Sequence, residues 1–327
     1  MDERHFWNGL VKLLLFTLII AAWNGLLWAD EHANQAAPQP GPEETAVAAP
    51  RHDSSDEIPA SEEHGGGHGE EGGVLGLLEH HLMDSNHYQF LGMDFHLPVL
   101  SIGGFRLPIT KHTIMQITVA ILLLVLFLPM RKIGAGVPHG LRNFFEVVIV
   151  FLRDEVIYPS MGEEDGRRYL PYFLTIFFFI LFSNLLGMIP YGSSSTGSIS
   201  VTGSLAAISL VVMFGSGIFR HGPLGYLGSF VPHGVPAFVI PILFPIEIVG
   251  VLVKHFALCI RLFANMLAGH AVITVFLGLI SSYFIAPVAI LGAVAISLLE
   301  LFVAFLQAYI FTILSALFIG TALHPEH

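Results

Sequence analysis

Residues 237–283 read AFVIPILFPIEIVGVLVKHFALCIRLFANMLAGHAVITVFLGLISSY, an apolar run with only three charged side chains. As one continuous helix, this stretch of 47 residues would be about 70 Å long. The hydrocarbon core of a bilayer is only about 30 Å thick. We therefore expect a membrane helix that tilts steeply, bends or breaks, with Pro241 and Pro245 as the places for a break.

Four further apolar runs accompany this stretch. They are residues 112–130, 169–190 and 203–219, and a last helix that follows a turn around 281–287. The chain is 54% hydrophobic and 12% charged, about half the charge of a typical soluble domain. The pattern predicts an all-α polytopic membrane protein with about five membrane helices, the last two forming a long tilted hairpin. Residues 138–158 are too charged to span, and they predict an amphipathic helix along the interface.

The N-terminal part of the chain differs from this membrane domain, which we assign to residues 112–327. Residues 1–29 hold an apolar run preceded by basic residues, and they predict a signal peptide or an uncleaved signal anchor. Residues 30–73, acidic and rich in His, Gly and Pro, predict a disordered segment. Residues 74–111 predict an amphipathic segment on the outer side, with a strand-like run at 95–100.

Basic residues in the loops fall mainly on one side of an alternating topology. Those on that side are Arg131, Lys132, Arg142, Arg153, Arg167, Arg168 and Arg220. Arg106 and Lys111 fall on the other side, next to the first of these spans. Because cytoplasmic loops carry the excess of Lys and Arg, we expect residues 30–111 outside and the C-terminus in the cytoplasm.

The charged side chains of residues 237–283 share one helix face. Glu247, Lys254 and Arg261 are spaced seven apart, and each step of seven returns to within about 20° of the start. Asn265, four residues after Arg261, lies on the same face. His270, nine residues after Arg261, points about 180° away. Burying such groups in a membrane costs about 2.5–3.5 kcal/mol each on insertion scales, so the stripe predicts a functional site.

The last helix carries two strongly polar side chains in mid-span, Glu300 and Gln307. In an antiparallel hairpin, two residues lie at the same depth when they are equally far along the chain from the turn. His270 and Glu300 are centred on position 285, and Arg261 and Gln307 on position 284, so each pair should lie at matching depth. A histidine beside a carboxylate is a proton-relay couple. Arg261 keeps its proton, so it can attract a carboxylate and repel a passing cation.

At these residues the chain resembles subunit a of the F-type ATP synthase. The resemblance rests on Arg261-Leu-Phe-Ala-Asn265-Met-Leu-Ala-Gly-His270, on Leu306-Gln307-Ala-Tyr-Ile-Phe311 and on a terminal Pro-Glu-His. It extends over roughly residues 76–327 and includes Glu79-His-His-Leu, Gly136-Val-Pro and Asn184-Leu-Leu-Gly-Met-Ile-Pro190.

The resemblance implies a non-catalytic stator subunit of a proton-translocating ATP synthase in the inner membrane of a bacterium. Its implied partners are a rotating ring of c subunits, the subunit b stalk, the rest of the complex and the lipid bilayer. Arg261 would separate two proton half-channels and engage each ring carboxylate as it passes.

The remaining polar residues receive their roles from the same resemblance. Asn265 and Gln307 would help to position the arginine. His270 and Glu300 would belong to the half-channel that opens to the outside. Glu247 would serve the exit path to the cytoplasm.

Other classes of function lack their sequence signals. No Gly-x4-Gly-Lys-Ser/Thr loop for nucleotides is present, no basic footprint for nucleic acid is visible, and no cofactor or metal is expected. The single cysteine, Cys259, excludes an intrachain disulfide and a cysteine-based zinc site. The alternative is a stand-alone proton-coupled ion or metal transporter. It would call for repeated halves or membrane-embedded Asp/His pairs, and the predicted spans contain no Asp.

Overall fold

The computed structural model describes four strands between residues 87 and 108, and residues 111–127, 140–189, 195–231, 236, 238–280 and 284–325. The predicted signal segment 1–29 and acidic segment 30–73 lie outside the described residues. The strands form two antiparallel hairpins inside the predicted segment 74–111. The pairs are β1 (His87–Phe90) with β2 (Met93–His96), and β3 (Val99–Ile102) with β4 (Phe105–Pro108).

The membrane domain is helical throughout its described residues. Its long elements are α3 (Lys111–Phe127), α6 (Glu163–Gly187), α7 (Ile199–Gly228), α8 (Ile240–Gly278) and α9 (Ala286–Leu323). Four of them, α6 to α9, are long and apolar enough to cross a membrane, and α3 is a shorter apolar helix of 17 residues. This confirms the all-α polytopic class. The chain is a multi-pass membrane protein.

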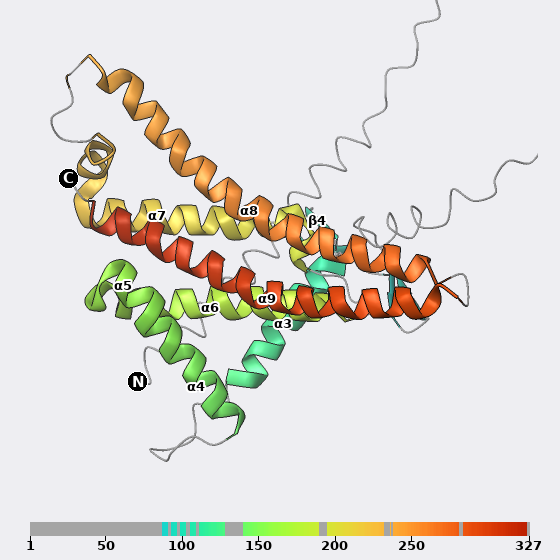
Figure 1. The fold of residues 1–327 in the computed structure, drawn as a ribbon. Helices are drawn as coiled ribbons and strands as arrows, with labels where there is room; N and C mark the ends of the chain where they lie inside the picture. The colour runs from blue at the N-terminus through green and yellow to red at the C-terminus, as the bar shows by residue number, and fades with distance from the viewer. Residues whose placement is uncertain are drawn as a thin grey trace, which may run out of the picture.

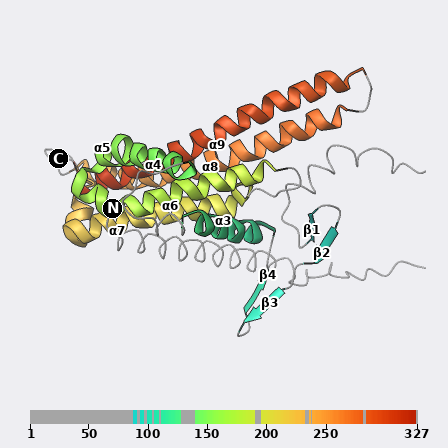
Figure 2. The same cartoon turned by 90° about the horizontal axis from the view of Figure 1, so that it is seen from below.

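The hairpin of α8 and α9 is inclined to α6 and α7 and extends past their ends (Figures 1 and 2). α8 is one helix of 39 residues in which Pro245 is internal. The helix is therefore not broken at Pro241 or Pro245, and the predicted tilt or bend in the membrane stays a prediction. Pro241 lies in the first turn, where a missing N–H is tolerated. By contrast, α7 is kinked at Gly222, whose φ of 74° suits glycine.

The core lies where α9 packs against α6, α7 and α8. Small buried residues recur every fourth position along α9, at Ala304, Ala308, Thr312, Ala316 and Gly320. Small residues allow membrane helices to approach closely. At Gly320 the approach is so close that a Cβ atom would collide with the backbone oxygen of Ser160.

The predicted interfacial helix at 138–158 is present as three consecutive segments. These are α4 (Leu141–Phe151), the π-helix η2 (Leu152–Ile157) and α5 (Tyr158–Met161). The apolar side chains of Leu152, Val156 and Ile157 are buried, whereas Phe144 and Val147 are exposed. A further short turn, η3 (Ser195–Gly197), precedes α7 and contacts α3, α6 and α8.

Candidate functional site

The hairpin brings His270 of α8 and Glu300 of α9 together. The imidazole Nδ1 lies 3.3 Å from the carboxylate Oε1. Glu300 is only 6% exposed, and no described donor makes a well-aligned hydrogen bond to either of its oxygens. A carboxylate so buried is stabilised by a positive partner, and His270 is the titratable group in contact with it.

The ring of His270 is also held by two backbone carbonyl groups. Nδ1 lies 3.0 Å from the oxygen of Met266, and Nε2 lies 2.9 Å from the oxygen of Gly187 at the end of α6. A carbonyl oxygen only accepts, and a neutral imidazole has only one N–H to donate. Both hydrogen bonds therefore form together when both ring nitrogens carry protons, and Glu300 balances the charge of that state.

Gly269 makes room for the buried carboxylate. A Cβ atom at this position would lie 2.6 Å from Oε1 and 2.8 Å from Cδ of Glu300. The absence of a side chain thus lets the carboxylate reach the backbone of α8 next to His270. The sequence analysis did not single out Gly269 or the carbonyl group of Gly187. The first could have been inferred from a small residue beside a polar pair, but no sequence signal marks the second.

A second polar contact joins the same two helices farther from the turn. The Nδ2 group of Asn265 donates to Oε1 of Gln307 over 2.8 Å, and the buried Nε2 of Gln307 has no hydrogen-bond partner among the described residues. Gln307 is therefore paired with Asn265, although the midpoint of 284 placed it at the depth of Arg261. The two α8 positions differ by about 40° around the helix, which turns Asn265 toward α9.

Glu247, Lys254 and Arg261 are all exposed along α8, as their spacing of seven predicts. In the part of the chain that the structure describes, Arg261 makes no ion pair or hydrogen bond. The residues one turn before and after Arg261 on this face, Ala257 and Ala264, are apolar and exposed. Arg261 is thus a permanent cation on an apolar surface of the subunit.

His255 is a buried titratable group that the sequence analysis did not consider. It is 3% exposed, its Nδ1 lies 3.0 Å from the Val251 oxygen, and its Nε2 has no partner. Its ring packs against Phe318 of α9, with centroids 5.2 Å apart. The sequence feature that could have identified His255 is its position next to Lys254 in an otherwise uncharged run.

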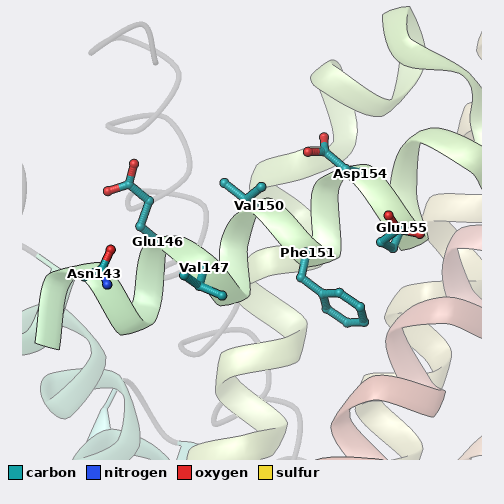
Figure 3. A pocket seen from close by; sticks show the side chains of 7 residues that line it. All are labelled: Asn143, Glu146, Val147, Val150, Phe151, Asp154 and Glu155. Carbon is teal, nitrogen blue, oxygen red and sulfur yellow. The ribbon is translucent and has the colours of Figure 1, made fainter. Parts of the chain in front are cut away.

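A hollow of about 460 Å³ lies on α4 and η2, away from these residues (Figure 3). Its lining comprises Asn143, Glu146, Val147, Val150, Phe151, Asp154 and Glu155. None of the predicted site residues contributes to it. Within the described ranges, no group of three His, Cys, Asp or Glu residues is placed to hold a metal ion.

Membrane-length helices that carry a half-buried histidine beside a buried glutamate, and an arginine with no partner among the described residues, define a polytopic membrane protein with ionisable groups inside its spans. A family model described as ATP synthase A chain matches residues 112–320. The chain belongs to this family, and it is therefore a component of an ATP synthase complex.

Named relatives agree with the family model. The chain is 45% identical over 260 residues to ATP synthase subunit a of Chloroherpeton thalassium, covering 76% of this chain and 77% of that protein. It is 46% identical over 237 residues to ATP synthase subunit a of Myxococcus xanthus, covering 71% and 78% respectively. A third relative, ATP synthase subunit a 2 of Chlorobaculum tepidum, is 45% identical over 256 residues, covering 75% and 72%.

Proposed function

We propose that this chain is the proton-conducting stator subunit of an F-type ATP synthase, with Arg261 separating two proton half-channels. The observation that carries the proposal is the placement of Arg261. It is exposed on α8 without a described partner, while His270, farther along the same helix, contacts the buried carboxylate of Glu300 on α9.

The electrostatics of Arg261 support a partner on another protein. An arginine in a membrane span costs about 2.5–3.5 kcal/mol on insertion scales, and no described acid of this chain offsets that cost. A guanidinium group pairs best with a carboxylate. A carboxylate on each subunit of a rotating c ring supplies that partner once per step.

The proton path follows from the two kinds of ionisable group. A proton from outside reaches His270 and Glu300 and passes to a ring carboxylate, which becomes neutral and can move into lipid. After nearly a full rotation, the carboxylate releases its proton near Glu247 toward the cytoplasm. Arg261 blocks direct leakage because a guanidinium group does not give up its proton in proteins and so stays charged.

The same proposal covers the assembly and its orientation. The partners are the c-ring subunits and the stalk subunit b, and ATP chemistry takes place on other subunits. The complex lies in the inner membrane of a bacterium, with residues 30–111 outside and the C-terminus in the cytoplasm. The basic loop residues support this orientation.

ATP-driven acidification of inverted membrane vesicles tests the proposal. We expect Arg261→Ala to abolish proton pumping at equal assembly of the complex. Lys254→Ala is the matched control, since Lys254 is an exposed cation one step of seven away on α8, and it should pump normally. Undiminished pumping by Arg261→Ala would refute the role of the arginine and the mechanism built on it.

A further inference from the structure

Gln116 of α3 is a buried polar residue for which the proposed mechanism has no role. Its side chain is 0% exposed, and neither Nε2 nor Oε1 has a hydrogen-bond partner among the residues that the structure describes. The next residues on the buried face of α3, Val119 and Leu123, are apolar and equally buried. A primary amide, with two donors and an acceptor, is costly to bury unless something bonds to it.

The packing of α3 against α6 places Gln116 at the end of the bundle where His270 is held. The Phe127 ring of α3 lies 4.9 Å from the Phe178 ring of α6. The two helices run in opposite directions and cross obliquely (Figure 1), and α3 also contacts η3, which follows the C-terminal end of α6. The N-terminal part of α3 thus lies toward the end of α6 that carries Gly187. Gln116 therefore lies near the level of Gly187, whose carbonyl oxygen binds His270.

Two further buried hydroxyl groups, without hydrogen-bond partners in the described part of the chain, lie on the elements that meet here. They are Ser183 Oγ on α6 and Ser195 Oγ on η3, each in a residue that is 1% exposed. α3, α6 and η3 contact one another pairwise. Thr196 of η3 also donates to Asn184 of α6 over 2.7 Å, which fixes the turn against the helix.

We propose that Gln116, with Ser183 and Ser195, holds ordered water molecules that lead protons to His270 and Glu300. This inference rests on the proposed function, and it adds α3 to the outer half-channel. Buried water typically makes about three hydrogen bonds to otherwise unpaired polar groups. Hydroxyl groups and water can each accept one proton while giving up another, so no net charge builds up along the chain. Gln116 does not titrate and acts as a positioning residue.

Thiol accessibility gives a readout that is independent of pumping. The single cysteine, Cys259, is first replaced by Ala, and then Gln116→Cys or Leu123→Cys is introduced into the assembled complex. Leu123 is the matched control, since it lies seven residues farther along the same buried face. We expect 2-aminoethyl methanethiosulfonate, added from outside and quantified by mass spectrometry, to label position 116 and not 123. No labelling at 116, or equal labelling at both positions, would overturn the inference.

Transport measurements separate this inference from the proposed function. Gln116→Met keeps the volume and removes the amide, so a purely structural role predicts native pumping at native assembly. We expect pumping to fall several-fold, and Gln116→Asn to recover most of the rate. Native pumping by Gln116→Met alongside inactive Arg261→Ala would overturn only the inference. Active Arg261→Ala would overturn the proposed function, and the inference with it.

Discussion

On the side of α8 that packs against α9, polar side chains meet partners from the same chain, whereas on its exposed side the charged residues lack ion pairs among the described residues. Asn265 bonds to Gln307, and His270 contacts Glu300. Glu247 and Arg261 are exposed. One helix thus carries a face whose polar groups contact α9 of the same chain, the α8–α9 seam, and an exposed face whose charged groups have no ion-pair partner among the described residues.

The difference indicates what substitutions on each side should do. Removing one member of a buried polar pair leaves its partner unsatisfied, which costs about 1–3 kcal/mol. Removing an exposed charge that has no partner within the chain costs the fold almost nothing. Seam variants should therefore affect stability and transport together, and surface variants should affect transport alone.

The largest expected effect is the loss of transport in Glu300→Gln. The amide retains the size of the carboxylate but cannot take up and release a proton. Proton transfer by a positioned side chain contributes about 10²–10⁴-fold in rate, so ATP-driven acidification should fall by about 10²-fold or more. Ser297→Ala, one turn earlier on α9, is the control and should pump normally. Near-native pumping by Glu300→Gln would show that the couple with His270 carries no protons.

A smaller effect is expected at Gly269, where the contact between α8 and α9 leaves no space for a side chain. Gly269→Ala places a methyl group against the carboxylate of Glu300, and such overpacking costs about 1–3 kcal/mol. The melting temperature of the purified complex should fall, and pumping should fall with it. Glu300→Asp in the same chain shortens the acid and should restore part of the lost stability. Independent, additive effects of the two changes would contradict a direct contact.

The spans and the hairpin could be predicted because their determinants are local or periodic. Apolar length alone marks α6 to α9, and the spacing of seven fixes the exposed stripe on α8. Residues equally far along the chain from the turn lie side by side in a hairpin, and this rule predicted the contact between His270 and Glu300. These properties depend on side-chain type and position, which a sequence states directly.

Other features depend on geometry that side-chain identity does not encode. The carbonyl oxygen of Gly187 that binds His270 is a backbone group, and every residue has one. The π-helix η2 and the kink at Gly222 reflect how the chain packs around its neighbours. The pairing of Gln307 with Asn265 depends on a rotation of about 40° around α8, which counting along a hairpin does not resolve.

A double-mutant cycle at Asn265 and Gln307 sharpens the comparison between the two sides. Hydrogen bonds between membrane helices average about 0.6 kcal/mol and reach about 1.7 kcal/mol. We expect a coupling of about 1 kcal/mol between Asn265→Ala and Gln307→Ala in reversible unfolding of the subunit in detergent. Arg261→Ala is the surface control, and its free energy of unfolding should change by less than about 0.5 kcal/mol. A larger loss in Arg261→Ala than in Gln307→Ala would reverse the comparison.

The smallest effect is expected for an exposed ion pair outside the membrane-length helices. Arg153 donates from Nε and Nη2 to the two carboxylate oxygens of Asp154, over 2.7 Å and 3.0 Å. These hydrogen bonds hold the pKa of Asp154 below its ordinary value of 3.8. A carboxyl group with a lowered pKa stabilises the fold above its unfolded pKa, and the contribution disappears as the pH falls through the folded value.

Thermal melts of the native chain and Asp154→Asn at pH 7, 5 and 3 measure this contribution. Because exposed ion pairs are screened and worth little, the two melting temperatures should differ by no more than about 1 °C at pH 7 and 5. The difference should shrink at pH 3 as the carboxylate of the native chain takes up a proton. If the difference in melting temperature grew as the pH fell, the pKa of Asp154 would not be lowered in the folded state. A large difference at pH 7 would mean that α4 and η2 depend on this pair as strongly as the α8–α9 seam depends on its own.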